Sequence, residues 1–354
     1  MSETIFLTGF PGFIAGRLVK RLAETDARFL LLVQPALKER ARQDITRLVE
    51  ETGAPESRFR IIEGDITKTD LGIEPAALEA AQKETNTLFH LAAIYDLAVA
   101  ADVARLVNVE GTRNVNRFAR SLKNLRRYHY VSTCYVAGKR KGLILEDELR
   151  HEAGFRNNYE ETKYRAEIEV DELKSELPVT IHRPSVVCGD SRTGETAKYD
   201  GIYYLIQYLR MQPRLLSLIN IGNHKVHLNL VPVDFVVEAM ATLAQDELAL
   251  GATIQLADPS PLTTHDLFEE IARALAGRSS RMTIPPKLVR PSLMLPFSPS
   301  LTGLPHAGVP YFFIDQTYDT THATGLLEPH GVRCPPFPTY VNALIDFVVR
   351  HPKL

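Results

Sequence analysis

Short aliphatic and β-branched runs alternate with longer helical patterns through the first half of the chain. In the helical stretches apolar residues recur at helical spacing, as at Val115, Phe118 and Leu122. This alternation is typical of a parallel sheet whose crossover helices cover both faces. It predicts strands at Thr4–Leu7, Phe29–Val33, Phe59–Ile62, Thr87–Leu91, Tyr128–Val131 and Val179–Arg183, and helices at Ile14–Glu24, Leu37–Glu51 and Val103–Leu122.

The pattern loosens after about residue 185. A stretch rich in Gly, Asp and Tyr (Gly189–Gly201) is followed by an expected strand at Val226–Leu230 and a helix with Pro232 in its first turn. We therefore expect an α/β fold: a Rossmann-type doubly wound parallel sheet with a smaller C-terminal substrate-binding lobe. The expected domains are residues 1–185, to which 226–258 return, and a lobe formed mainly by 186–354.

Residues 284–313 combine many prolines with large apolar side chains and few charges. This composition suits neither a regular helix nor a solvated linker. It indicates an irregular wrap on the core or, equally, a substrate lid or lipid-touching surface.

The composition is that of a globular protein, since 45% of the 354 residues are hydrophobic and 24% are charged. The 41 basic and 43 acidic side chains leave a formal net charge of -2. No overall field therefore favours nucleic acid or anionic lipid. We expect no nucleic-acid partner and at most a peripheral contact with membranes.

The three cysteines are far apart and form no CxxC pair. This spacing argues against a disulfide framework and a zinc site, so we expect no bound metal. The chain starts without a basic segment, and no apolar run has the length of a bilayer span. These features fit a reducing, cytoplasmic location. The three cysteines are Cys134, Cys188 and Cys334.

A glycine-rich segment, TGFPGFIAG, joins the first strand to the first helix. Gly9 and Gly12 let the backbone turn tightly and approach a pyrophosphate at the start of the helix, and Ala15 is small enough for close packing. Alone this could be a turn without a ligand, but its place at the first strand-to-helix junction strengthens the signal. The residues expected to contact a cofactor here are Gly9, Phe10, Pro11, Gly12, Phe13 and Ile14.

The second strand ends at Gln34, where an NAD-specific site usually offers an acidic side chain to the ribose. The missing acid leaves room for a 2′-phosphate. Lys38 and Arg40 could neutralise that phosphate or could be two solvated charges on a helix. We therefore favour NADP(H) over NAD(H) as the cofactor.

Two further strand ends carry candidate cofactor contacts. After the third strand, Asp65 and Ile66 follow a glycine, and the carboxylate can accept from the adenine amino group. After the fourth strand, the small side chains of Leu91-Ala92-Ala93 allow close backbone approach to the cofactor. His90, just before them, is expected to be a packed histidine.

Tyr159 and Lys163 lie four residues apart, so both project from one face of a helix. A neighbouring ammonium favours the phenolate and should lower the pKa of the phenol, which makes a proton donor for a carbonyl under reduction. Upstream, Ser132 and Thr133 close the fifth strand, where Ser132 could contact the cofactor and Thr133 could polarise the substrate oxygen. The alternative is that these two hydroxyls only cap backbone.

An ordered set of motifs resembles the extended short-chain dehydrogenase/reductase superfamily over roughly residues 1–260. It consists of TGFPGFIAG, GDI, HLAA, NVEGT, VSTCYVAG, YEETK and RPSVVCGD. The resemblance implies a Rossmann domain with Thr133, Tyr159 and Lys163 as the catalytic set and Asn108 beside them. It also implies that Lys163 holds nicotinamide ribose hydroxyls and that Pro184, Ser185 and Val186 lie along the nicotinamide.

Within that superfamily, GDSRTG, LVPVDFVVEAMATL and VSTCYV are most similar to the fatty acyl-CoA reductase, male-sterility and thioester-reductase branch, which includes the reductase domains of carboxylic acid reductases. The resemblance implies NADPH-dependent reduction of an acyl thioester to an aldehyde or alcohol. The donor would be acyl-CoA or an acyl group on a separate carrier protein. Arg192 could meet a phosphate or form a salt bridge, while Tyr203, Tyr204, Leu205 and 284–313 could line an apolar acyl channel or belong to the core.

Other interpretations stay open. The same scaffold serves dehydrogenases of bulky sterol-like alcohols or ketones and nucleotide-sugar epimerases, although the apolar second lobe disfavours an epimerase. A non-catalytic NADP-sensing regulator is the alternative outside the enzymes, and the intact catalytic set argues against it. A homo-oligomer is compatible with all of these.

Overall fold

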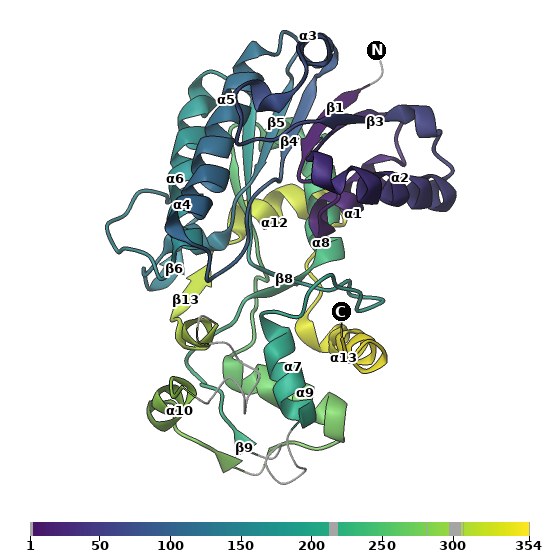
Figure 1. The fold of residues 1–354 in the computed structure, drawn as a ribbon. Helices are drawn as coiled ribbons and strands as arrows, with labels where there is room; N and C mark the ends of the chain where they lie inside the picture. Colours follow the sequence, from purple (N-terminus) through teal and green to yellow (C-terminus); the bar gives the residue numbers. More distant parts are fainter. Residues whose placement is uncertain (1–2, 212–218, 281, 297–305, 307, 354) are drawn as a thin grey trace.

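A seven-stranded parallel sheet forms the centre of the computed structural model, which describes residues 3–211, 219–280, 282–296, 306 and 308–353. Its strands are β1 (Thr4–Thr8), β2 (Arg28–Val33), β3 (Phe59–Glu63), β4 (Thr87–His90), β5 (Arg127–Val131), β7 (Val179–Pro184) and β11 (Thr253–Leu256). Their spatial order is β3-β2-β1-β4-β5-β7-β11, which confirms the predicted Rossmann-type doubly wound sheet (Figure 1). The order reverses between β1 and β4, where such sheets bind dinucleotides at the carboxyl ends of the strands.

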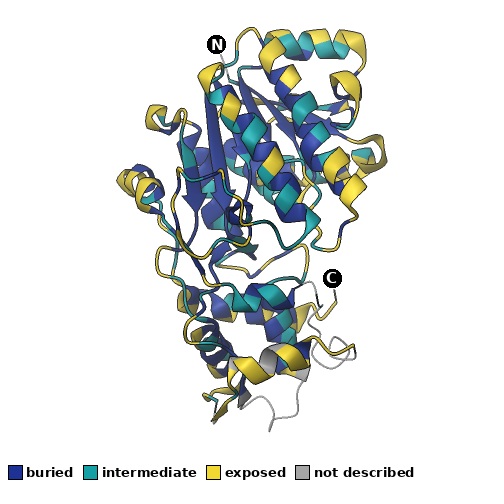
Figure 2. Cartoon of the chain, turned by 90° about the vertical axis from the view of Figure 1, so that its left-hand side faces the viewer, coloured by how far each residue is buried: buried dark blue, intermediate teal, exposed yellow. Residues whose placement is uncertain are grey.

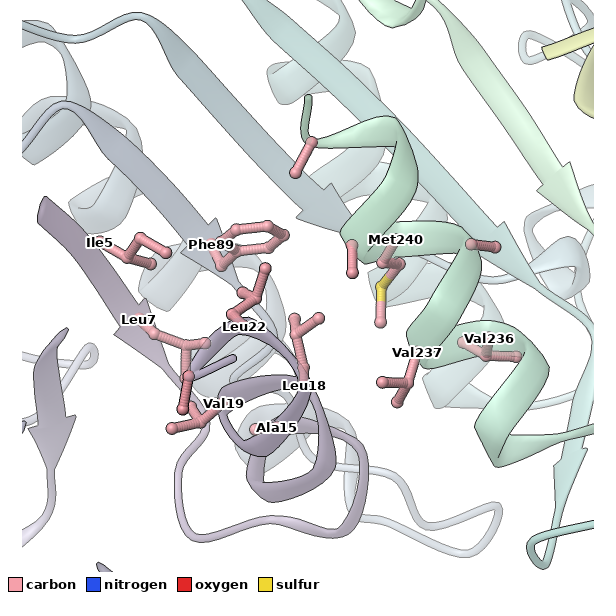
Figure 3. Packing of buried hydrophobic residues seen from close by; sticks show 14 of the residues in the cluster. Ile5, Leu7, Ala15, Leu18, Val19, Leu22, Phe89, Val236, Val237 and Met240 are labelled. Atoms are coloured by element: carbon pink, nitrogen blue, oxygen red, sulfur yellow. The ribbon is translucent and has the colours of Figure 1, made fainter. Parts of the chain in front are cut away.

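Helices cover both faces of the sheet because its strands are apolar on both sides. One face carries α1 (Phe13–Leu22), α2 (Lys38–Thr52), α8 (Val233–Leu243) and α12 (Thr321–Leu327), and the other carries α3 (Pro75–Glu84), α5 (Gly111–Ser121) and α6 (Asn158–Asp171). In β1, Ile5 and Leu7 join the first cluster whereas Phe6 joins the second. Leu18 of α1 and Met240 of α8 lie in the same cluster (Figure 3).

The predicted helix Val103–Leu122 is interrupted, so that prediction is wrong in its middle. The chain forms α4 (Ala101–Ala104), then the wider π-helical turn η4 (Arg105–Glu110), and then α5. π-helical turns are rare inside α-helices and are frequent at functional sites. This one contains Asn108, whose side chain forms hydrogen bonds with Ile94 and Thr162, outside the helix.

A smaller lobe lies beyond the carboxyl ends of the strands (Figure 1). Its own buried cluster is built mainly on three helices, and Figure 2 shows buried residues in both parts of the molecule. The elements of the lobe are β8 (Val186–Cys188), α7 (Ile202–Met211), β9 (Ile219–Asn220), β10 (Leu230–Pro232), α9 (Thr264–Ala276), β12 (Met282–Thr283), α10 (Pro286–Leu293), η9 (Val309–Phe313) and α13 (Val341–Arg350).

Two predictions for the second half need correction. The strand expected at Val226–Leu230 lies further on, at β10, because Leu230 and the next two residues pair with β8, while His227 makes only an isolated bridge to Thr263. Pro232 therefore ends β10 and caps α8 instead of lying in its first turn. The Pro-rich 284–313 stretch does contain a regular helix, α10, and its residues 297–305 and 307 lie outside the described part.

Late segments of the chain return to the sheet. Besides β11 and α8, α12 packs on the first face. β13 (Gln316–Tyr318) pairs with β6 (Gly142–Ile144) in a separate two-stranded sheet.

Among the described residues, no helix combines the length and the apolar character that a bilayer span requires. Short 3-10 turns are η1 (Pro35–Leu37), η2 (Glu56–Arg58), η3 (Thr69–Gly72), η5 (Cys134–Ala137), η6 (Glu172–Ser175), η8 (Glu247–Ala249), η10 (Glu328–His330) and η11 (Phe337–Thr339).

Candidate active site

The loop between β1 and α1 makes a sharp turn that two glycines permit. Gly9 has a φ of +96°, and a Cβ there would lie 2.9 Å from the backbone nitrogen of Ala92. A Cβ on Gly12 would lie 2.6 Å from the carbonyl oxygen of Gly9. Gly12 is the N-cap of α1, which no described side chain caps. This uncapped helix start, beside two glycines that leave the backbone accessible, fits the pyrophosphate of a dinucleotide.

The other residues of the loop divide between core and surface. The Phe10 ring is buried in the same cluster as Ala15, as close packing at that position requires. Pro11 is also buried, while Phe13 and Ile14 are half-buried in the first turn of α1.

We expect Gly9→Ala to lower the free energy of unfolding by about 1–3 kcal/mol, because alanine is strained at positive φ and its Cβ has no space. Dinucleotide binding should weaken with it, since the loop must move. Gly16→Ala is the matched control: Gly16 is helical and a Cβ there meets nothing within 4 Å, so the protein should gain about 0.5–1 kcal/mol. Urea unfolding and cofactor titration measure both effects, and equal stability of the two variants would contradict this account of the loop.

The residues that follow β2 are mostly exposed, and two of their charged side chains lie near acidic partners. Gln34 is exposed and precedes η1. Lys38 is paired with Glu63 at the end of β3, whereas Arg40 is 62% exposed and lies 3.9 Å from Asp44. Of the two side chains predicted to bind the 2′-phosphate, Arg40 therefore makes the longer contact within the protein and is the more exposed.

The ends of β3 and β4 lie on the two sides of this loop region. Asp65 accepts at Oδ1 from both the N–H and the hydroxyl of Thr67 at 2.8 Å. Ile66 is buried, Leu91 and Ala92 are half-buried against Gly9, and Ala93 is exposed. His90 is fully buried, and burial lowers its pKa to about 3, so the expectation of a packed histidine is confirmed.

A groove of about 530 Å³ runs from the glycine loop along α1 to residues 190–197. Arg192 lies in it, 79% exposed, with its guanidinium 3.6 Å from the Asp190 carboxylate. Arg17 is paired across the same groove with Glu195 at 3.1 Å. The predicted salt bridge of Arg192 is thus present, and its head group still faces the groove.

The predicted catalytic side chains meet at the carboxyl end of β5. Tyr159 and Lys163 lie one turn apart on α6 and are both buried. Thr133 follows β5 and caps η5, accepting at Oγ1 from the N–H of Tyr135 at 3.2 Å. Thr133 acts to lower the pKa of Tyr159, and Lys163 Nζ donates to the Val131 carbonyl at 2.8 Å.

The expected lowering of the Tyr159 pKa is wrong for this arrangement. Burial raises the pKa of Tyr159, while Thr133 lowers it and Glu160 raises it further. Burial also lowers the pKa of Lys163 to about 7, and Glu167 acts in the opposite direction. Lys163 donates to Val131 and to the Tyr130 hydroxyl, each at 2.8 Å. The phenol is therefore held in its protonated form.

A buried ion pair lies beneath this set. Glu167, one turn beyond Lys163 on α6, accepts from Arg183 at 2.6 Å, and both side chains are at most 2% exposed. Ser132 donates its hydroxyl to the second oxygen of Glu167. Ser132 therefore faces the ion pair, which neither of the two expectations for its hydroxyl included.

Asn108 bonds to neighbouring chain segments. It accepts from the N–H of Ile94 at 2.9 Å and donates to the Thr162 hydroxyl at 3.0 Å. It thus ties η4 to α6 beside the predicted catalytic residues.

The segment after β7 leads from the sheet to the lobe. Pro184 ends β7, and Ser185 donates to Asn229 Oδ1 at 2.7 Å. Val186 starts β8 and lines the cavity described next.

A cavity of about 160 Å³ is lined by aromatic side chains, among them Tyr95, through which it borders Tyr159. The Tyr95 ring stands edge-on to that of Tyr159, with centroids 5.1 Å apart. A second, apolar cavity of about 40 Å³ shares Tyr204 and Phe312 with the first and also includes Leu205. The side chains that line the first cavity include Tyr95, Asp96, Tyr135, Lys198, Asp200, Tyr204, Leu228, Tyr311 and Phe312.

The residues expected either in an acyl channel or in the core divide between cavity lining and core. Tyr204 and Leu205 line these cavities, as does Phe312 of the 284–313 stretch. Tyr203 instead belongs to the core of the lobe, and its hydroxyl accepts from the N–H of Gly189 at 2.8 Å.

The fold that carries this site is shared with known proteins. Residues 7–240 match the male sterility protein family of NAD-binding domains. The chain belongs to that family. It is accordingly a nicotinamide-dependent oxidoreductase of the extended short-chain dehydrogenase/reductase type, as the motifs predicted.

This chain is similar to several known reductases and reductase domains. It is 27% identical over 290 residues to glycine betaine reductase ATRR of Emericella nidulans, covering 76% of this chain and 22% of that protein. It is 23% identical over 337 residues to the chloroplastic fatty acyl-CoA reductase 2 of Arabidopsis thaliana, covering 73% and 53%. The crystal structure of the terminal R domain from the myxalamid PKS-NRPS pathway has a TM-score of 0.82 and 25% identity, with coverage of 100% and 92%. The chain thus spans about a fifth and about half of the two curated relatives.

Several residues around the candidate active site were not predicted from the sequence. Glu167 continues the one-turn spacing of Tyr159 and Lys163, so helical periodicity could have indicated it. Tyr130 precedes the Ser132-Thr133 pair on a strand, where alternation could have placed it under Lys163. Tyr95 and Tyr311 come from a loop and a distant turn, and no spacing signal connects them.

Proposed function

We propose that this male sterility family member reduces an acyl thioester to an aldehyde with NADPH. The observation that carries the proposal is the meeting of Thr133, at the end of β5, with the buried Tyr159 and Lys163 of α6, where the Tyr95 ring of the tyrosine-lined cavity contacts Tyr159. The names of two relatives support the same chemistry, since one is a fatty acyl-CoA reductase and another is an R domain of a PKS-NRPS pathway.

The proposed reaction converts RCO–SR′, NADPH and H⁺ into RCHO, R′SH and NADP⁺. When bound, the reduced nicotinamide supplies a hydride to the carbonyl carbon. Thr133 and Tyr159 donate hydrogen bonds to the carbonyl oxygen as it becomes negative, and Tyr159 then transfers its proton to that oxygen. The raised pKa of Tyr159 keeps the phenol protonated until the oxygen becomes the stronger base.

The remaining steps release the product. Lys163, one turn away, favours the phenolate that proton transfer leaves behind. The hemithioacetal then loses its C–S bond, and the aldehyde forms as the hydroxyl proton leaves and the thiol departs. The cavity beside Tyr159 shields this collapse from water.

The preference for NADPH rests on the residues after β2. The exposed Gln34 adds no negative charge there, and Arg40 offers an exposed guanidinium to a 2′-phosphate. We assign cofactor binding to residues 1–185 with 226–258, and substrate binding mainly to 186–354. Arg192 would meet a phosphate from the groove along α1.

The cavities support an acyl group of modest size. The one beside Tyr159 is about 160 Å³, and its apolar extension past Tyr204 and Phe312 is about 40 Å³. Sites for drug-sized ligands have about 300–1,000 Å³, so a sterol-like ketone fits less well. The thiol arm, from coenzyme A or a carrier protein, would approach from outside.

We expect pantetheine thioesters of short and medium acyl chains to oxidise NADPH faster than NADH, with one thiol and one aldehyde released per nicotinamide. Nicotinamide absorbance, a thiol reagent and a hydrazine trap follow the three products. Methyl ketones of matched chain length serve as the control substrates. Turnover of ketones without thioesters would contradict the proposed reaction, and two nicotinamides per thiol would extend it to the alcohol.

A further inference from the structure

A buried chain of polar side chains extends from Lys163 to the strand that enters the glycine loop. Lys163 Nζ donates to the Tyr130 hydroxyl at 2.8 Å, and Thr112 acts to lower the pKa of Tyr130. Thr112 Oγ1 lies 3.1 Å from His90 Nε2, and His90 Nδ1 lies 2.8 Å from the hydroxyl of Thr8. All five side chains are at most 3% exposed. The chain therefore crosses from α6 through β5, α5 and β4 to β1.

The donors and acceptors at the far end of this chain have one consistent arrangement. Thr8 Oγ1 accepts from the N–H of Ala92 at 3.1 Å, and its own proton is directed to His90 Nδ1. Thr112 donates its proton to the carbonyl of Asn108 at 2.7 Å, so its oxygen accepts from His90 Nε2–H. One neutral imidazole tautomer satisfies both contacts, and the lowered pKa of His90 agrees with a neutral ring.

At the near end, Lys163 Nζ donates to the Tyr130 hydroxyl, whose pKa burial raises and Thr112 acts to lower. The Thr112 hydroxyl donates its proton to the carbonyl of Asn108. The Tyr130 hydroxyl therefore accepts from Lys163 in a buried, polar surrounding.

We propose that Tyr130 is a positioning residue whose hydroxyl fixes the Lys163 ammonium, while burial on β5 against the His90 ring fixes Tyr130. The Tyr130 ring supports this contact, since Lys163 Nζ lies 4.4 Å from its centroid. The Val131 carbonyl accepts a second N–H of the ammonium.

Titratable groups on four elements surround the ammonium. Tyr159 and Glu167 share α6 with it, Tyr130 lies on β5, and His90 lies on β4. On β7, Arg183 neutralises Glu167. With its pKa already lowered to about 7 by burial, Lys163 has few groups that stabilise its charge. Loss of the Tyr130 hydroxyl should lower that pKa by about one further unit.

Tyr130→Phe tests this inference, with Tyr128→Phe as the matched control. Tyr128 lies two residues earlier on β5, is equally buried, and donates to Asn116 at 2.7 Å, away from Lys163. Carbon-13 NMR of lysine-labelled protein without cofactor follows the titration of Lys163, whose signal a Lys163→Met variant identifies. We expect the apparent pKa to fall by about one unit in Tyr130→Phe and to stay constant in Tyr128→Phe.

Turnover supplies a second measurement, which rests on the proposed function. If the charged lysine is the active form, kcat/KM falls as the pH rises through the pKa of Lys163. Tyr130→Phe should then lose about eightfold at pH 7.5 and only about twofold at pH 6. Equal titration of Lys163 in both phenylalanine variants would overturn the positioning role. Inactivity of the unaltered protein toward thioesters would instead overturn the proposed function and leave the NMR result standing.

Discussion

Replacing Tyr159 with phenylalanine should lower turnover by about 10²–10⁴-fold while the affinity for the dinucleotide stays within a fewfold. The change removes the proton that the reduced carbonyl oxygen needs and little else. The phenylalanine ring can keep its edge contact with Tyr95, and Thr133 keeps its cap on the N–H of Tyr135. The loss should therefore appear in kcat, because the phenol acts on the developing oxyanion.

Tyr164→Phe provides the control for this variant. Tyr164 lies on the same helix, and its hydroxyl accepts from the backbone N–H of His151 at 3.2 Å. Its removal should change stability slightly and turnover by less than about threefold. Single-turnover reduction of a pantetheine thioester and a fluorescence titration with NADPH separate chemistry from binding. Full activity of Tyr159→Phe would remove Tyr159 from the proposed chemistry.

The sheet could be predicted from the sequence because each of its early strands is a continuous apolar run between helical patterns. In β2 and β7 the predicted and observed bounds differ by one residue. β11 was predicted only as part of the 226–258 segment that returns to the Rossmann domain. The packing of α12 on the sheet was not predicted. Such long-range contacts depend on packing against α8 and β11, which local periodicity does not encode.

The site was predictable where one element carries two of its residues. The spacing of Tyr159 and Lys163 on α6, and the place of Thr133 at a strand end, were sufficient to bring them together. The direction of the Tyr159 pKa was not predictable, because it is set mainly by burial, to which the Tyr95 ring from a distant loop contributes. The π-helical turn at Asn108 likewise follows from tertiary hydrogen bonds and not from residue preference.

Removing one member of the Glu167–Arg183 pair should destabilise the protein by about 3–5 kcal/mol, because the remaining charge would be buried without its partner. Arg183 donates to one Glu167 oxygen from Nε at 2.8 Å and also donates to the carbonyls of Glu146 and Glu148. Ser132 donates to the other Glu167 oxygen. Glu167→Gln and Arg183→Met should each show the loss by urea unfolding. The double variant should lose clearly less than the sum of the two.

An ion pair nearer the solvent, between Glu169 of the same helix and Arg113 of α5, separates this burial effect from the loss of charge alone. Glu169 pairs with Arg113 at 2.6 Å, but the two side chains are 23% and 43% exposed. Glu169→Gln should therefore cost less than about 1 kcal/mol, since water stabilises the charge that remains. If Glu167→Gln cost no more than Glu169→Gln, or if the double variant were additive, the buried pair would not be what holds β7 against α6. The frame on which Lys163 and Ser132 depend would then have to come from apolar packing, with Ala166 and Val170 of the same helix as the residues to test.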